Sequence, residues 1–417
     1  MEEAADYDTP SLRQRWDELG TATLLLLDSV ELIEVELPFI AAVTTAVGTH
    51  RRRPLVLVRL ECRRPDDGST IVGWGECAAL ADTTYDTEDA ALAWATLESI
   101  LLPALIQSAR ALGGLLPSVG SLRRLAGLAP GRPLSFAALE VAVGDAHLRA
   151  AGRSLGGLLG VAGAEVRPGA VVGVSDSTGA LLATVGVLAS QGYARVKVKI
   201  GPDDGLTTVT ALAGWAESAV GPVPRFQVDA NGSYGADDLE RLVALDGFRL
   251  LCIEQPFARD DLASHRRLAA RIDTPVCLDE SLDGIDAVVG AVTSGACSVV
   301  CIKPARLGGI GAALDTIDWC TGHGTPWWIG GMFESGVGRR VTTTLAALPG
   351  PSLPGDLAPP ATYLAGDLVT PVTWRRDPPS GYGTVVLDQG PGTGPPPDQE
   401  AIETYRVRGA GVAVSDI

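Results

Sequence analysis

The first part of the chain contains short segments in which apolar and polar residues alternate. Three of them have the pattern of strands, at residues 31–37, 54–60 and 71–76. Alternation with a period of two is typical of strands that bury one face. Apolar residues then recur at helical spacing over residues 90–105 and 136–148. The pattern predicts an α+β unit over residues 28–160, preceded by a polar extension at residues 1–27.

The pattern changes near residue 168, where continuous apolar segments begin to alternate with helical ones. The segments with the pattern of strands are residues 170–174, 195–200, 226–229, 250–254, 276–279, 299–303 and 327–329. Such strands are typical of a parallel sheet that helices cover on both faces. Repeats of about 25 residues favour a closed β/α barrel over an open sheet. We expect the barrel at residues 161–355, and a Pro- and Gly-rich segment at 356–417 that packs back on the first unit.

Length and composition agree with two folded units. A chain of 417 residues exceeds what one hydrophobic core supports. Its net charge of −17 repels polyanions, so we expect neither nucleic acid nor a membrane as a partner. The start, Met1-Glu2-Glu3, lacks the basic residues of a signal peptide. The seven cysteines include no C-x-x-C pair and are typical of buried thiols in a reducing compartment. We therefore expect a cytoplasmic protein.

Ionisable residues stand at the ends of five consecutive predicted strands. They are Lys199, Asp229, Glu254, Asp279 and Lys303. In a barrel the C-terminal strand ends meet in one mouth, where active sites are built. Three carboxylates packed there would repel one another, and a divalent cation such as Mg²⁺ or Mn²⁺ relieves that repulsion. The alternative, that each carboxylate caps a helix or pairs with a surface base, is disfavoured for three consecutive strand ends.

Two lysines flank the predicted metal site. Lys199 and Lys303 lie on either side of the carboxylates, and Lys197 points the same way as Lys199. A lysine acts as a base only when its pKa is lowered, and a nearby cation, partial burial and the charge of Lys197 would each lower it. A metal between two lysines suits removal of the proton next to a substrate carboxylate. A barrel that binds metal and ligand without turnover is the alternative from another class.

Five motifs, taken together, resemble the enolase superfamily and its muconate-lactonizing subgroup. They are Lys197-Val198-Lys199, Asp229-Ala230-Asn231, Glu254-Gln255-Pro256, Asp279-Glu280 and Lys303-Pro304. The segment from Gly330 to Arg339 is similar to the o-succinylbenzoate synthase and N-acylamino acid racemase branch. The resemblance implies a modified (β/α)7β TIM-type barrel with an N-terminal α+β capping domain. It also implies Mg²⁺ on Asp229, Glu254 and Asp279.

The same resemblance implies a reaction and its supporting residues. Lys199 would remove the α-proton and Lys303 would stabilise the resulting enediolate, giving o-succinylbenzoate, a menaquinone precursor. The alternative is an N-acylamino acid racemase or dipeptide epimerase, in which both lysines exchange protons. Substrate-binding or supporting roles fall to Lys197, Asn231, Glu280, Gly331, Met332 and Glu334. Residues 47–53 form a loop of the kind that closes over substrate, and members of this group commonly form homo-oligomers. Ala305 and Leu307 depart from the usual pattern and leave the substrate open.

Overall fold

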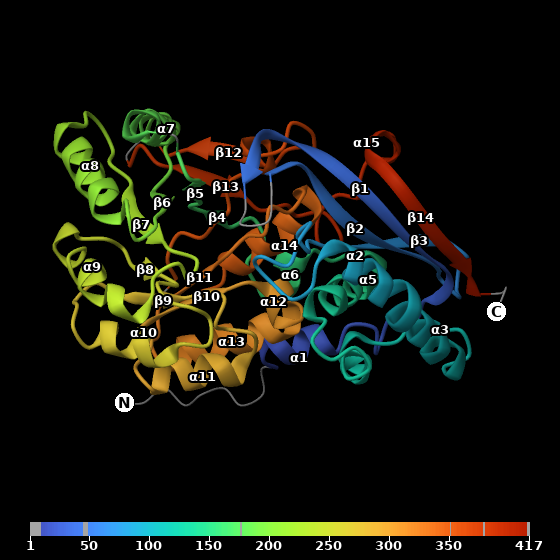
Figure 1. Ribbon diagram of the computed structural model, residues 1–417. Coiled ribbons are helices and arrows are strands. Elements are labelled where there is room, and N and C mark those ends of the chain that lie inside the picture. The colour runs from blue at the N-terminus through green and yellow to red at the C-terminus, as the bar shows by residue number, and fades with distance from the viewer. Residues whose placement is uncertain (1–9, 45–48, 176, 351, 378–379, 415–417) are drawn as a thin grey trace, which may run out of the picture.

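The computed structural model describes residues 10–44, 49–175, 177–350, 352–377 and 380–414. An antiparallel sheet in the order β14-β1-β2-β3 stands beside a seven-stranded parallel sheet in the order β11-β10-β9-β8-β7-β6-β5 (Figure 1). The antiparallel sheet consists of β1 (Leu26–Thr44), β2 (Thr49–Arg63), β3 (Thr70–Cys77) and β14 (Arg406–Ala413). Residues 49–53, expected in a loop, therefore belong to β2. Residues 47 and 48 lie outside the described part of the chain.

Helices of the first unit cover one face of the antiparallel sheet. Their bounds are α2 (Ala90–Thr96), a π-helical turn at Leu97–Leu101, α3 (Leu102–Ala111), α4 (Arg123–Ala126), α5 (Pro133–Ala150) and α6 (Leu155–Leu159). Two glycines of β3 let α5 approach closely. A Cβ at Gly75 would lie 2.0 Å from the carbonyl oxygen of Ala138, and one at Gly73 would lie 2.4 Å from that of Ala142. The Gly-Trp-Gly sequence of β3 thus determines how α5 packs on the sheet.

One helical stretch of this unit, Ala90–Ala111, is long and apolar enough to cross a membrane by length and composition. Half of the stretch is buried inside the fold, where Trp94, Leu97 and Leu101 join the hydrophobic core. Packing of this kind is that of a core helix in a folded domain.

The parallel sheet curls into a barrel whose strands lie where the apolar segments predict them. The strands are β5 (Gly169–Val172), β6 (Arg195–Lys199), β7 (Arg225–Asp229), β8 (Ile253–Glu254), β9 (Val276–Leu278), β10 (Val299–Ile302) and β11 (Trp327–Ile329). The helices between and after them are α7 (Thr178–Gln191), α8 (Gly205–Ser218), α9 (Leu239–Val243), α10 (Leu262–Ala269), α11 (Ile285–Thr293), α12 (Pro304–Leu307), α13 (Ile310–Gly322) and α14 (Gly336–Ala346). Single parallel bridges join Trp327 to Ser352 and Gly169 to Asp356. Residues 352–356 therefore lie between the two edge strands and take the place of an eighth strand.

The rest of the chain packs on both units. A small sheet joins β12 (Thr373–Arg376), β13 (Gly383–Val386) and β4 (Glu165–Val166), and α15 (Gln399–Tyr405) leads into β14. Within the segment predicted as a polar extension, α1 (Leu12–Asp17) places Trp16, which is fully buried, against Gly144 of α5. Arg13 of α1 pairs with Asp315 of α13 at 3.0 Å. This short helix therefore contacts both the capping domain and the barrel.

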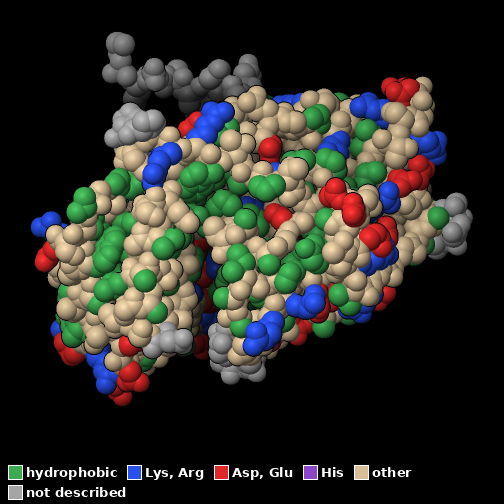
Figure 2. Space-filling view, turned by 90° about the horizontal axis from the view of Figure 1, so that it is seen from above, with side chains coloured by type: hydrophobic (Ala, Val, Ile, Leu, Met, Phe, Trp, Pro, Cys, Tyr) green, Lys and Arg blue, Asp and Glu red, His purple; other side chains and the backbone are tan. Residues whose placement is uncertain are grey.

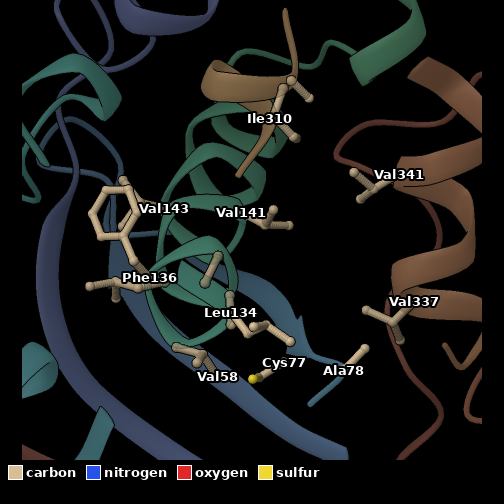
Figure 3. Close-up of a cluster of buried hydrophobic side chains, with 14 of the residues drawn as sticks. Val58, Cys77, Ala78, Leu134, Phe136, Val141, Val143, Ile310, Val337 and Val341 are labelled. Carbon is tan, nitrogen blue, oxygen red and sulfur yellow. The ribbon is translucent and has the colours of Figure 1, made fainter. Parts of the chain in front are cut away.

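An apolar interface joins the capping domain to the barrel. Figure 3 shows Val141 of α5 facing Val337 and Val341 of α14. Ile310 lies beside α5. A cavity of about 40 Å³ remains there, and Lys303 and Met332 are among the residues that line it. The barrel mouth is thus covered on one side by the capping domain.

Candidate active site

The predicted site residues stand side by side around the barrel mouth. Lys199, Asp229 and Glu254 end β6, β7 and β8, and they are paired neighbours in the parallel ladder. Asp279 and Lys303 directly follow β9 and β10. Figure 2 shows a deep hollow between the barrel helices on the left and the capping domain on the right, with acidic and basic side chains inside it.

The three carboxylates of Asp229, Glu254 and Asp279 are almost completely removed from solvent. Nζ of Lys197 lies 3.3 Å from Asp229 Oδ2 and 2.9 Å from Glu254 Oε2. Burial, followed by the charge of Asp229, raises the pKa of Glu254 to about 8. The raised pKa reflects first the burial of Glu254 and second its repulsion by Asp229, and a cation would relieve that repulsion.

The two candidate catalytic lysines lie at opposite ends of this row of carboxylates. Nζ of Lys199 lies 2.6 Å from Asp229 Oδ2 and also donates to Asn231. Nζ of Lys303 lies 2.8 Å from Asp279 Oδ2. The Lys199 side chain is 27% exposed and that of Lys303 is 7% exposed. One amine thus faces the open side of the mouth, and the other lies against the capping domain.

Neighbouring carboxylates raise the pKa values of Lys303 and Lys197. Burial would lower the pKa of Lys303, but the charge of Asp279 outweighs it and the pKa lies above its usual value. The pKa of Lys197 is likewise raised, because Asp356, Glu254 and Asp229 together outweigh its burial. Lys197 is therefore a counter-ion for the carboxylates. The sequence predicted only that its charge would lower the pKa of Lys199.

The carboxylates suit a hard divalent cation, although only two of the three lie close enough together to share one. One oxygen of Glu254, one of Asp279 and the Sγ atom of Cys301 all lie within 4.8 Å of one another. Asp229 is outside this group, and its Oδ2 contacts Lys197 and Lys199 instead. Carboxylate oxygens are the donors that Mg²⁺ prefers, so the residues fit this ion once Asp229 exchanges its lysine contacts for metal.

The supporting residues predicted after β7 and β9 lie at the rim of the mouth. Nδ2 of Asn231 donates to Glu280 Oε1 at 2.7 Å, and its Oδ1 accepts from Lys199. Asn231 has a φ of 44°, in the left-handed region that few residues other than glycine adopt. This backbone conformation holds the Asn231 amide between Lys199 and Glu280.

The predicted residues after β11 form a wall that the capping domain holds. Arg53 is buried, and its guanidinium donates to the carbonyl oxygens of Met332 at 3.0 Å and Phe333 at 3.1 Å. Glu334 pairs with Arg339 at 2.8 Å, and a Cβ at Gly331 would lie 2.8 Å from the same guanidinium. Arg53, the last residue of the segment expected as a substrate-closing loop, instead uses its donors inside the fold.

Three residues at the mouth were not predicted from the sequence: Tyr85, Arg306 and Asp356. The hydroxyl of Tyr85 donates to Asp279 Oδ2 at 2.8 Å and accepts from Lys303 and Arg306. The carboxylate of Asp356 lies 2.7 Å from Nζ of Lys197. Tyr85 comes from a loop of the capping domain, and Asp356 stands just past the predicted end of the barrel. Only Arg306 could have been predicted to lie near the mouth. It stands three residues after Lys303, in a short helix that begins with Pro304.

Comparison with known proteins agrees with this arrangement. The family model described as "Enolase C-terminal domain-like" matches residues 180–401, which is more than half of the chain. The chain belongs to the enolase superfamily. It is 36% identical over 377 residues to an N-succinylamino acid racemase from Amycolatopsis sp, covering 90% of this chain and 96% of that protein. It is 34% identical over 374 residues to an o-succinylbenzoate synthase from Geobacillus stearothermophilus, covering 89% and 93%.

Solved structures show the same superfamily fold. A member of the enolase superfamily from Listeria innocua superposes with a TM-score of 0.83 at 29% identity, covering 94% of this chain and all of that one. The predicted TIM-type barrel with a capping domain is confirmed, and the protein is an enzyme of the superfamily. Its similarity extends to relatives named as synthases and to relatives named as racemases.

Proposed function

We propose that the protein is a Mg²⁺-dependent o-succinylbenzoate synthase. It would dehydrate 2-succinyl-6-hydroxy-2,4-cyclohexadiene-1-carboxylate to o-succinylbenzoate, a step of menaquinone synthesis. The observation that carries the proposal is the placement of Lys199 and Lys303 at opposite ends of three buried carboxylates. Several relatives at 33–34% identity are named as this synthase.

Five residues of the mouth have a task in this reaction. When bound by Asp229, Glu254 and Asp279, Mg²⁺ would supply positive charge that stabilises the negative charge developing on the substrate carboxylate. Lys199 is the base, because its amine is the more exposed of the two and is freed once Asp229 turns away from it. Lys199 takes the α-proton and then returns it to the departing hydroxyl, which leaves as water. The ammonium of Lys303 stays protonated and stabilises the same negative charge from the other side.

The test is an ultraviolet assay for the aromatic product, with and without a chelator. Turnover should require Mg²⁺, with Mn²⁺ as a substitute, and should be lost in Lys199→Ala. Arg15→Ala, at a half-buried arginine of α1 far from the mouth in sequence, is a control for handling and folding. Normal aromatisation by Lys199→Ala would refute the assigned role of that lysine.

A second activity, racemisation of N-succinylamino acids, is supported by one specific observation. The relative at 36% identity carries that name, and both lysines that a two-base reaction needs are present here. The broader alternatives are other N-acylamino acids or dipeptides. In deuterated water a racemase incorporates deuterium at the α-position of recovered substrate, whereas a synthase alone releases the aromatic product. One protein can catalyse both, since the two reactions begin with the same proton removal.

The remaining expectations concern partners and location. The substrate would be a small carboxylate, with no nucleic acid and no membrane as a partner, in agreement with the net charge of −17. A cytoplasmic location and a homo-oligomeric state also remain predictions. Size-exclusion chromatography with light scattering would measure the oligomeric state.

A further inference from the structure

The loop between β3 and α2 carries Tyr85 into the barrel mouth. Residues 81–88 belong to no helix or strand, so the place of the Tyr85 hydroxyl depends on side-chain contacts of the loop. A bridge between Leu80 and Asp89 joins the two ends of the loop. The carboxylate of Glu88 accepts from two backbone amides at the start of α5. These contacts hold the ends of the loop, and a different contact holds the segment before Tyr85.

That contact joins Asp82 of the loop to His50 of β2. Nε2 of His50 lies 2.6 Å from Asp82 Oδ2. Because an ionised carboxylate only accepts hydrogen bonds, the imidazole donates through Nε2–H. The other oxygen of the same carboxylate, Oδ1, accepts from the backbone N–H of Thr84 at 2.9 Å. A single carboxylate therefore connects β2 to the residue immediately before Tyr85.

The series of contacts that begins at His50 ends at a candidate catalytic lysine. The hydroxyl of Tyr85 accepts from Lys303 and donates to Asp279. The side chains of His50 and Asp82 are 26% and 16% exposed, so both are partly shielded from solvent. A single pair of this kind contributes little to the stability of a whole domain. We therefore expect the pair to affect the position of the loop more than the folding of the protein.

We propose that His50 and Asp82 are positioning residues that act on Lys303 through Tyr85. We call this pair the His50–Asp82 clip. The clip restricts the backbone before Tyr85, so that the hydroxyl already lies at Lys303 when substrate arrives. Groups that are held in place before the reaction need no reorganisation in the transition state, so the clip raises kcat and leaves KM nearly unchanged. The inference rests on the proposed function, because the reaction assigned above uses the Lys303 ammonium.

The test is a double-mutant cycle, run in whichever assay shows turnover by the wild type, aromatisation or deuterium exchange. His50→Ala should lower kcat about threefold to tenfold, the range for a partly exposed hydrogen bond to a charged group. In a Tyr85→Phe background the same substitution should change kcat by less than about twofold, because the hydroxyl that the clip positions is gone. His50→Gln, whose side-chain amide also donates, should restore most of kcat. The matched control is His323→Ala, at an exposed histidine that contacts Trp319, and it should keep the wild-type kcat.

An equal loss of kcat in both backgrounds, no loss in His50→Ala, or no recovery in His50→Gln would overturn the proposal. Amide hydrogen exchange tests the clip without substrate. Peptides that span residues 81–88 should exchange faster in His50→Ala than in the wild type, and at the wild-type rate in His323→Ala. If His50→Ala does not fold, His50→Phe, which keeps a ring and removes the donor, replaces it in both measurements. A wild type without turnover contradicts the proposed function, whereas unchanged amide exchange contradicts the clip, so the two failures are distinguishable.

Discussion

The hydroxyl of Tyr85 connects the capping domain to only one of the two candidate catalytic lysines. It accepts a hydrogen bond from Lys303 and donates one to Asp279, while the ring centroid lies 4.2 Å from Nζ of Lys303. Tyr85→Phe removes the hydroxyl and keeps the ring over the ammonium. Hydrogen bonds that involve a charged group contribute about 1.5–3 kcal/mol, which corresponds to about a 10- to 100-fold effect on rate. We expect kcat to fall by that factor in steps that need Lys303, with a smaller change in KM.

In Tyr85→Phe, proton exchange on the substrate face served by Lys303 can be compared with exchange on the face served by Lys199 in the same protein. Deuterium exchange is measured separately for each enantiomer of an N-succinylamino acid in deuterated water. Exchange on the face served by Lys303 should slow in Tyr85→Phe, and exchange on the face served by Lys199 should not. Tyr363→Phe is the matched control, because Tyr363 is half-buried like Tyr85 and its hydroxyl contacts Arg339 and the carbonyl oxygen of Glu334 but neither lysine. An equal loss on both faces, or a similar loss in the control, would refute the role given to Tyr85.

Three further predictions concern stability. Burial raises the pKa of Glu140, which accepts from the backbone of Ile310 at the start of α13, from 4.5 to about 7, a difference that corresponds to about 3 kcal/mol. The folded protein holds this proton more tightly, so the contribution is complete below pH 4.5 and is lost as pH rises to 7. Unfolding midpoints measured against pH should show this loss in the wild type and not in Glu140→Gln. Lys197→Met should destabilise the metal-free protein by about 3–5 kcal/mol, because it leaves buried carboxylates unpaired, and Mg²⁺ should restore part of this in urea unfolding. Gly75→Ala should cost about 1–3 kcal/mol or more in thermal unfolding, since its Cβ would meet α5, whereas Gly247→Ala has no neighbour within 4 Å and should be nearly neutral.

The sequence pattern predicts the barrel strands well because their apolar runs and charged ends follow a regular repeat. That repeat places Lys199, Asp229 and Glu254 on neighbouring strands without any knowledge of loops. Tyr85 and Asp356 belong to segments whose path depends on tertiary packing, so no local periodicity indicates that they enter the mouth. Asp356 arrives there because residues 352–356 fill the gap between β11 and β5.

The contacts that set the lysine pKa values are also beyond what sequence spacing shows. Sequence spacing predicts that like charges are near one another, but it does not show which opposite charge contacts each amine. In the structure each of Lys197 and Lys303 has a carboxylate within 3 Å, and this attraction outweighs burial. Arg53 shows the same limit, because three consecutive arginines resemble a solvated run and only the fold reveals that the third is buried.

The three lysines of the mouth are also the only lysines in the chain, since all other members of its 33 basic side chains are arginines. Apart from the α-amino group of the first residue, the protein therefore offers primary amines only in its own active site. Lys199 is the most exposed of them. Acylating reagents, amine-coupled resins and fluorescent active esters, which label most proteins at random over their surface, would here act as affinity labels.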